Sequence, residues 1–228
     1  MKRVVVAELL DTDNGTVREV EDSLADLRMF NRRFGGVRAM IALLHEVAAR
    51  RGLKEIDWLD VAGGAGDVAT LTAESLGHSG IKVRPVVIDR ASSHMNGTNR
   101  NICGDALALP FRDGSFDVVG SSLFVHHLEP EELRRFAVEG LRAARHAFVI
   151  NDLVRHPLHL ALAIAGRPIY RSRITRHDAP ASVRRAYTTD EVRGILQDAG
   201  AAEVSVQTFY LYRMGVIVWK KAPQPTTT

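Results

Sequence analysis

An apolar strand that runs directly into a glycine-rich loop constrains the fold of this chain more than any other feature. The residues from Ile56 to Val61 predict a buried strand, and those from Gly66 to Leu76 predict a helix. The loop between them, Ala62-Gly63-Gly64-Ala65-Gly66, is rich in glycine, which lets a ligand approach the backbone without meeting a Cβ atom. The free N–H groups at the start of the helix favour a nucleotide at this turn.

Strands and helices alternate through the rest of the chain. A helix from Glu131 to Ala144 is preceded by Pro130, and another begins near Thr188, whose spacing to Glu191 matches a capping box. Further strands are predicted at Val83–Ile88, Asn101–Cys103, Phe116–Leu123, Ala147–Leu153, Val204–Tyr212 and Val216–Lys220. A very short turn joins the last two strands, which are therefore antiparallel. The pattern predicts an α/β, Rossmann-like seven-stranded sheet that is mostly parallel, with one antiparallel strand.

The predicted sheet domain covers residues 55–222 and has additional segments before and within it. Residues 1–54 contain predicted helices, and residues 153–188 form an insertion after the fifth strand. The insertion is apolar and is interrupted by Pro157, Gly166, Pro168 and Pro180. We interpret both segments as lids that roof an apolar acceptor pocket, with a homodimer interface as the alternative for the insertion. The tail, residues 223–228, is predicted to be disordered.

Composition indicates an ordinary globular protein. Its 228 residues suit one domain, and a lone cysteine, Cys103, excludes an internal disulfide. Neither a leader peptide nor a membrane span is apparent, so we expect a cytoplasmic protein. The net charge of +3 is accompanied by an arginine cluster between Arg155 and Arg193, which is either a solvated surface or a site for anions. No aromatic-rich basic stripe indicates a nucleic-acid partner.

Acidic residues stand at three predicted strand ends. Asp60 lies at the tip of the first strand, Asp89 ends the second, and Asp105 follows the third. The carboxyl ends of parallel strands border one crevice, so these carboxylates are expected to meet at a ligand. The sequence Gly64 to Ala69 also fits the dinucleotide pattern G-x-G-x-x-A, so the loop alone leaves a nicotinamide cofactor open. Asp67 would repel a pyrophosphate, however, and Asp60 suits a cofactor that carries an ammonium and a sulfonium. We therefore favour a methyl donor.

The order of these motifs resembles that of class I S-adenosylmethionine-dependent methyltransferases, most of all the ubiquinone/menaquinone-biosynthesis (type 11) group. The residues that carry the resemblance are Asp60–Gly66, Asp89, Gly104–Phe111 and Ser115–Val119. It implies that the loop faces the methionine part of S-adenosylmethionine, Asp89 the ribose and Asp105 the adenine, with S-adenosylhomocysteine as the product. The expected cofactor-binding residues are Asp60, Ala62, Gly63, Gly64, Asp89, Arg90, Gly104, Asp105, Ala106, Ser121 and Ser122. Ala62 departs from the family, which usually has a glycine there.

The acceptor side is expected after the fourth strand, where His126 and His127 occur. A phenol has a pKa of about 10, so a nearby base assists its methylation, and a histidine with a pKa of about 6.5 suits that task. Asp152, at the end of the fifth strand, is expected in the same crevice and would orient a histidine or the acceptor. The alternatives are that a histidine or Asp152 caps a helix, or that all three bind a metal. Adjacent histidines in a turn do not favour a metal, so we predict none.

Segments at Asn31–Gly36, Arg176–Asp178 and Val183–Arg185 are similar to those of bacterial methyltransferases that are assumed to modify phenolic or polyketide products. The resemblance implies acceptor-binding roles for Asn31, Phe34, His177 and Arg184. We expect O-methylation of a small aromatic or polyketide-like acceptor. C-methylation, as in quinone biosynthesis, is the nearest alternative, followed by a nucleic-acid methyltransferase and a NAD-dependent oxidoreductase.

Overall fold

The structure is a computed structural model and describes residues 1–12, 14–91, 101–199 and 201–221. Its strands are β1 (Glu55–Val61), β2 (Lys82–Asp89), β3 (Asn101–Cys103), β4 (Phe116–Ser122), β5 (Ala144–Leu153), β6 (Val204–Phe209) and β7 (Arg213–Trp219). Its α-helices are α1 (Val17–Arg33), α2 (Gly36–Arg51), α3 (Asp67–His78), α4 (Pro130–Ala143), α5 (Pro157–Ala165), α6 (Arg173–Arg185) and α7 (Thr189–Asp198). Short 3₁₀ helices are η1 (Leu10–Thr12), η3 (Val125–His127) and η4 (Arg167–Ile169).

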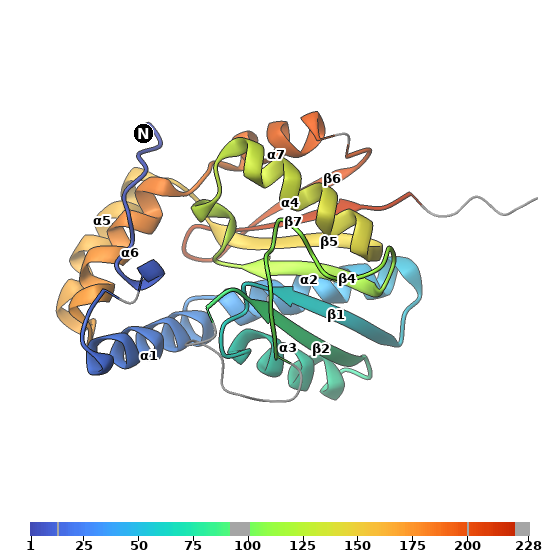
Figure 1. The fold of residues 1–228 in the computed structure, drawn as a ribbon, viewed down its shortest axis with the longest axis horizontal. Helices are drawn as coiled ribbons and strands as arrows, with labels where there is room; N and C mark the ends of the chain where they lie inside the picture. The colour runs from blue at the N-terminus through green and yellow to red at the C-terminus, as the bar shows by residue number, and fades with distance from the viewer. Residues whose placement is uncertain (13, 92–100, 200, 222–228) are drawn as a thin grey trace, which may run out of the picture.

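The strands form a seven-stranded sheet in the order β3-β2-β1-β4-β5-β7-β6 (Figure 1). Strand β7 runs antiparallel to β5 and β6, and the other described pairs are parallel. This confirms the predicted Rossmann-like sheet with one antiparallel strand. The winding direction reverses between β1 and β4, where Leu59 pairs with Val119. A ligand crevice is therefore expected beyond the carboxyl ends of these two strands.

Apolar side chains on both faces of the sheet form two cores. On one face, α2 and α3 pack on the strands, with Met40 and Trp58 among the fully buried residues. On the other face, α4 and α7 pack on the strands through Phe136 and Leu196. Phe136 meets Phe148 of β5 edge to face, with 4.9 Å between the ring centroids. Burying a side chain of this size contributes roughly 1.5–3 kcal/mol, so these layers hold the strand ends in place.

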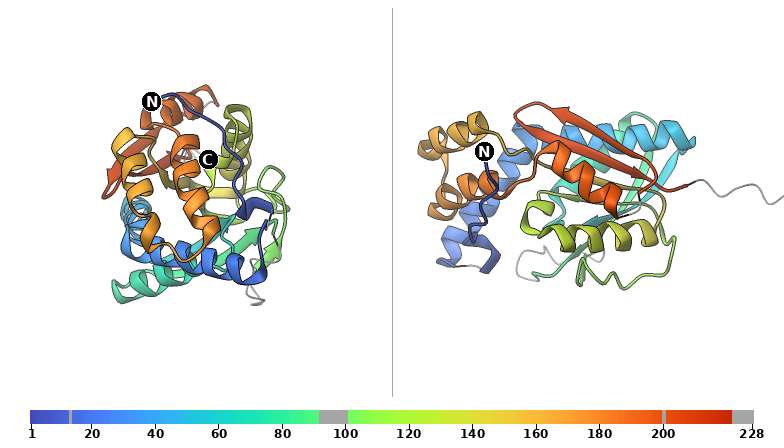
Figure 2. Two further views of the ribbon diagram at one scale, coloured as in Figure 1. Left: turned by 90° about the vertical axis from the view of Figure 1, so that its left-hand side faces the viewer. Right: turned by 90° about the horizontal axis from the view of Figure 1, so that it is seen from above.

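A third group of helices lies beyond the carboxyl ends of the strands. Helices α1, α5 and α6 pack on one another there, to the left of the sheet in Figure 1. The N-terminal residues run across this group, as the left view of Figure 2 shows, and the amide of Val4 donates to the carbonyl oxygen of Arg184 at 3.0 Å. Helix α2 also belongs to residues 1–54, but it packs on the sheet. The segments beyond the sheet edge are therefore α1, the N-terminal residues and the insertion.

The insertion stays helical across Pro180, where the sequence predicts an interruption. Pro180 lies inside α6. It has no N–H to donate to the carbonyl oxygen of Arg176 one turn earlier, and the Nε of Arg167 donates to that oxygen instead, at 3.2 Å. The predicted break at Pro180 is wrong because a neighbouring side chain satisfies the exposed carbonyl. Pro157 and Pro168 lie in the first turns of α5 and η4, where proline is tolerated.

Other helices and strands begin or end a few residues away from their predicted boundaries. The predicted strand from Val204 ends at Phe209, because Leu211 and Tyr212 adopt φ angles of 56° and 58° that turn the chain. The capping box at Thr188 is present. The tail predicted at residues 223–228 lies outside the described residues. Among the residues described, no helix is both long and apolar enough to cross a membrane.

Candidate active site

A cavity of about 940 Å³ lies between the carboxyl ends of the strands and the group of α1, α5 and α6. We call the part bordered by the glycine loop, Asp89 and Asp105 the loop half. The part bordered by Glu8, Phe30 and His126 is the helical half. Both halves belong to one continuous cavity.

The glycine loop turns through backbone conformations that favour glycine. The φ angle is 53° at Gly64 and 78° at Gly66, and it is 57° at Ala62, where the methyl group makes it unfavourable. The amide of Ala62 donates to the carbonyl oxygen of Ile88 at 2.7 Å, and the amide of Gly64 donates to Oδ2 of Asp89 at 2.8 Å. These bonds fix the loop against the end of β2. The departure at Ala62 therefore leaves the loop folded as a tight turn.

Asp60 is a buried carboxylate without a partner at the edge of the loop half. It is fully buried, and neither oxygen has a hydrogen-bond partner among the described residues. Burial, followed by the charge of Asp89, raises the pKa of Asp60 to about 8. A Cβ atom on Gly63 would lie 2.7 Å from Oδ2 of Asp60, so the glycine keeps the space beside the carboxylate open. A cationic group such as an ammonium would supply the missing partner.

The other predicted cofactor residues border the loop half, with one exception. Those that line the cavity are Asp60, Ala62, Gly63, Gly64, Asp89, Arg90, Gly104, Asp105, Ala106 and Ser122. The exception is Ser121, which is fully buried outside the lining, and its Oγ has no partner within the described part of the chain. The lining offers an unpaired carboxylate to a cation and further carboxylates to the hydroxyl and amino groups of a nucleoside. These residues fit S-adenosylmethionine.

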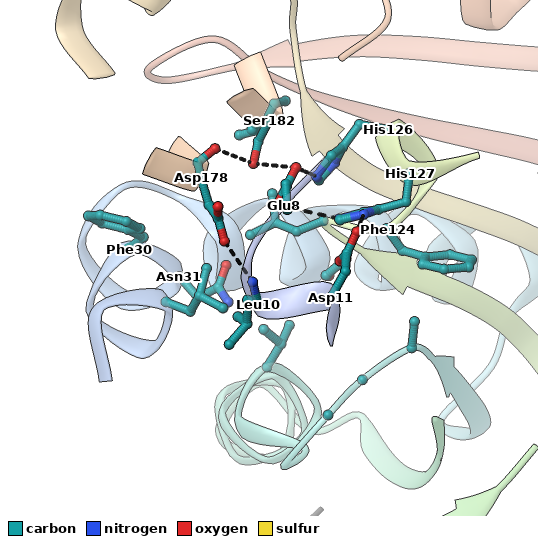
Figure 3. Close-up of a pocket in the computed structure, with 18 of the residues that line it drawn as sticks. Glu8, Leu10, Asp11, Phe30, Asn31, Phe124, His126, His127, Asp178 and Ser182 are labelled. Atoms are coloured by element: carbon teal, nitrogen blue, oxygen red, sulfur yellow. Dashed lines mark hydrogen bonds and ion pairs between the residues drawn. The ribbon is translucent and has the colours of Figure 1, made fainter. Parts of the chain in front are cut away.

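His126 and Asp152 form a buried pair next to the helical half. Nδ1 of His126 lies 2.7 Å from Oδ1 of Asp152, and the backbone amide of His126 donates to Oδ2 at 3.2 Å. Burial acts to raise the pKa of Asp152, but the charge and hydrogen bond of His126 outweigh it and lower that pKa. An ionised Asp152 fixes the imidazole proton on Nδ1 and leaves the Nε2 lone pair directed toward Glu8 (Figure 3).

Glu8 and Asp11 of the N-terminal segment complete a group that we call the carboxylate–histidine cluster: Glu8, Asp11, His126, His127 and Asp152. Figure 3 shows the first four of these residues. Nε2 of His126 lies 3.6 Å from Oε1 of Glu8, and Nε2 of His127 lies 3.9 Å from Oε2. Nδ1 of His127 lies 3.2 Å from Oδ2 of Asp11. Burial would raise the pKa of Asp11, but His127 and Arg185 lower it overall. Glu8 therefore lies beside the Nε2 atoms of both imidazoles and lines the cavity. Asp152 lies beside Nδ1 of His126 and is not part of the lining.

The predicted acceptor residues divide into two pairs. Asn31 and Phe34 line the cavity, whereas His177 and Arg184 lie outside its lining. His177 and Arg184 stand seven residues apart on α6 and so share one side of that helix. The side of α6 that borders the cavity carries Asp178, Ser182 and Arg185.

Arg213, at the start of β7, is a cavity-lining cation that the sequence analysis did not identify. Its guanidinium donates to the carbonyl oxygen of Phe34 at 3.1 Å and to Oδ1 of Asn31 at 3.3 Å, while Nη1 has no partner among the described residues. Burial lowers the pKa of Arg213 to about 10. The surrounding strand is apolar, so its sequence gives no sign of a cation facing a cavity.

Residues 59–147 match the family model described as a methyltransferase domain. The match covers fewer than half of the residues of the chain, and it favours the methyl donor over the dinucleotide that the glycine loop leaves open. Residues 59–147 of this protein form a methyltransferase domain. Structures of the plantazolicin methyltransferase hold S-adenosylhomocysteine, and the residues of the loop half fit S-adenosylmethionine.

Solved structures share the fold of this methyltransferase. A SAM-dependent methyltransferase from Aquifex aeolicus has a TM-score of 0.53 at 23% identity, with 77% of this chain and 88% of that chain covered. The plantazolicin methyltransferase, in complex with a monoazolic desmethyl analogue and S-adenosylhomocysteine, has a TM-score of 0.66 at 12% identity, with 93% of each chain covered. At these identities the likeness shows the fold. No curated protein matches the sequence.

Glu8 and Asp11 of the methyltransferase were also missed by the sequence analysis. The first residues show no helical or strand periodicity, so nothing local marks them as part of a site. Only the folded chain brings this segment beside η3, which lies far along the sequence. By contrast, His126 follows β4 and Asp152 lies at the end of β5, and the sequence predicts both strands and both residues.

Proposed function

We propose that this methyltransferase transfers a methyl group to an oxygen atom of a small aromatic or polyketide-like acceptor. The observation that carries the proposal is the make-up of the helical half, which has apolar walls and the carboxylate–histidine cluster at one end. The apolar wall residues are Leu24, Leu27, Phe30, Phe34, Leu162, Ile169 and Tyr170. Phe30 meets the ring of Tyr170 edge-on, with 5.3 Å between the centroids. Such walls favour an aromatic ring, and the cluster favours an ionisable hydroxyl.

We assign the loop half to the cofactor. In this assignment Asp60 pairs with the ammonium of the methionine part, Asp89 binds the ribose hydroxyls, and Asp105 binds the adenine amino group. Gly63 and Gly64 leave space for the methionine part beside the loop. Bound S-adenosylmethionine supplies a methyl group on a positively charged sulfur that is a good leaving group.

The carboxylate–histidine cluster is assigned to the removal of the acceptor proton. A phenol with a pKa of about 10 is mostly protonated at neutral pH, so proton removal strengthens its oxygen as a nucleophile. His126, held by Asp152, and His127, held by Asp11, each present Nε2 to the cluster and can hold that proton. Helices α1, α5 and α6 act as a lid that excludes water and orients the acceptor.

The proposal is tested by incubating the purified protein with S-adenosylmethionine and a panel of simple phenols and hydroxylated aromatic polyketides. We expect mass spectrometry to show the gain of one methyl group and proton NMR to show the methyl signal of an aryl ether. His126→Ala should lose turnover while keeping its affinity for S-adenosylhomocysteine in calorimetry.

The NMR signal also separates the competing reactions. A methyl group on ring carbon would assign C-methylation, as in quinone biosynthesis, in place of the O-methylation proposed. If S-adenosylhomocysteine binds but no phenolic compound is methylated, the proposed acceptor class is wrong.

A further inference from the structure

Glu8 lies in an N-terminal segment that is fixed on both sides of it. Before Glu8, the guanidinium of Arg3 donates to the carbonyl oxygen of Leu128 at 2.9 Å. After it, the amide of Leu9 donates to Oδ1 of Asp178 at 2.9 Å. Glu8 is only 9% exposed and lines the cavity. Its carboxylate therefore has a defined position in the wall of the helical half.

The two oxygens of Glu8 differ in their partners. Oε1 accepts a hydrogen bond from Oγ of Ser182 at 2.8 Å, as Figure 3 shows. Oε2 accepts no hydrogen bond from any described residue and lies 3.9 Å from Nε2 of His127, which is beyond hydrogen-bond distance. The ionisable groups around the carboxylate are His126 and His127 on η3, Asp11 on η1 and Asp178 on α6. Arg185 of α6 pairs with Asp11. Oε2 is thus the oxygen available to a ligand.

Both histidines are arranged to take a proton from Glu8. Nδ1 of His126 lies 2.7 Å from Asp152, and Nδ1 of His127 lies 3.2 Å from Asp11, so a carboxylate holds the proton on each Nδ1. The lone pairs of both Nε2 atoms then face Glu8, at 3.6 and 3.9 Å. The carboxylate oxygens of Glu8 and the Nε2 atoms of His126 and His127 therefore face one another, with no fixed proton between them. This arrangement suits a group that gains and loses a proton.

We propose that Glu8 is the catalytic base of the methyl transfer and that His126 and His127 carry its proton away. The inference rests on the proposed function, because it requires an acceptor hydroxyl in the helical half. Oε2 of Glu8 removes the hydroxyl proton while the acceptor oxygen forms a bond to the methyl carbon. The bond from that carbon to sulfur breaks, and its electron pair stays on sulfur. The products are a methyl ether, neutral S-adenosylhomocysteine and protonated Glu8, whose proton passes through a histidine Nε2 to solvent.

The ionisation of Glu8 agrees with this role. Burial raises the pKa of Glu8 to about 7; Asp11 and Asp178 also raise it, and His127 and Ser182 oppose them. A general base is most effective when its pKa lies near the working pH. Only the ionised carboxylate can take the proton, so kcat/KM of the wild type should rise with pH until about pH 7 and then level off.

The test compares the wild type, Glu8→Gln and Glu74→Gln on phenols of increasing acidity, from unsubstituted phenol to nitrophenols. Glutamine keeps the shape of Glu8 but cannot take the proton, and Glu74 is an exposed residue of α3 that serves as a matched control. We expect Glu8→Gln to lower kcat for phenol about 10²–10⁴-fold, the usual contribution of a general base. The loss should vanish for nitrophenols, which ionise near neutral pH without help. Glu74→Gln should match the wild type.

Two results would overturn the assignment of Glu8. One is a kcat of Glu8→Gln for phenol that stays within about twofold of the wild-type value. The other is an equal loss of kcat on every phenol, which would indicate a positioning role. Calorimetry with S-adenosylhomocysteine confirms that the variant is folded. Stoichiometric binding of a transition metal that Glu8→Gln abolishes would also overturn the proposal, because the metal would occupy the same lone pairs.

A measurement without an acceptor separates this proposal from the proposed function. The infrared difference between the wild type and Glu8→Gln should show the carbonyl stretch of a protonated carboxyl group that disappears as the pH rises through about 7. Glu8 that stays ionised from pH 5 to pH 9 would contradict the base assignment even if O-methylation is established. A titrating band together with no methylation of any phenol would instead remove the acceptor class on which the assignment rests.

Discussion

Asp60→Asn should abolish the pH dependence of S-adenosylhomocysteine binding. Asp60 is fully buried with no partner among the described residues, and burial and Asp89 raise its pKa to about 8. At pH 7 only about one-tenth of the protein then carries an ionised Asp60, and at pH 6 about one-hundredth. If the ligand ammonium pairs with the ionised form, affinity rises about ninefold from pH 6 to pH 7, close to the 1.36 kcal/mol of one pKa unit. Binding at pH 7 should release about 0.9 proton.

Calorimetry in buffers of different ionisation enthalpy measures both the affinity and the released protons. Asp60→Asn should bind with one affinity from pH 6 to pH 7.5 and release almost no proton. Asp198→Asn, at an exposed position at the end of α7, serves as the matched control and should keep the wild-type dependence. A wild-type Kd that stays within about twofold from pH 6 to pH 7, or a ninefold rise that persists in Asp60→Asn, would refute the reasoning.

Two further predictions concern stability. Ala62→Gly should raise the melting temperature by about 1–4 °C. Relief of the φ angle of 57° is worth about 1–2 kcal/mol, and the added freedom of glycine in the unfolded chain costs about 0.5–1 kcal/mol. A lower melting temperature would contradict this. Glu8→Gln should gain stability relative to the wild type as pH rises. Burial raises the pKa of Glu8 from 4.5 to about 7, so the native state binds this proton more tightly than the unfolded state and the wild type loses stability across that window. Thermal denaturation at pH 5 and pH 8 checks this, and an equal difference at both pH values would count against it.

Local patterns in the sequence were sufficient for the sheet and for most of the loop half. Continuous apolar runs mark buried strands, and a glycine-rich turn marks the point where a strand meets a helix. Because the carboxyl ends of parallel strands meet at one edge, the sequence alone places Asp60, Asp89 and Asp105 at one cavity. The same reasoning brought His126 and Asp152 together, and their side chains lie 2.7 Å apart.

The helical half depends on contacts that local patterns do not contain. The rotation of α6 directs Asp178 and Ser182 to the cavity and leaves His177 and Arg184 outside its lining, and the phase of a helix is set by what it packs against. The predicted break at Pro180 is wrong because the side chain of Arg167, on a different element, supplies the hydrogen bond that proline cannot donate.

The sequence by itself determined the Rossmann-like sheet, the glycine loop and the acidic strand ends, because each follows from residues that are neighbours in the chain. Only the tertiary structure decided that Glu8 and Asp11 stand against His126 and His127, and that Arg213 is buried beside Asn31. These contacts join segments that lie far apart in the sequence. They form because burying apolar surface draws the segments together, and no pattern within either segment records where it will dock.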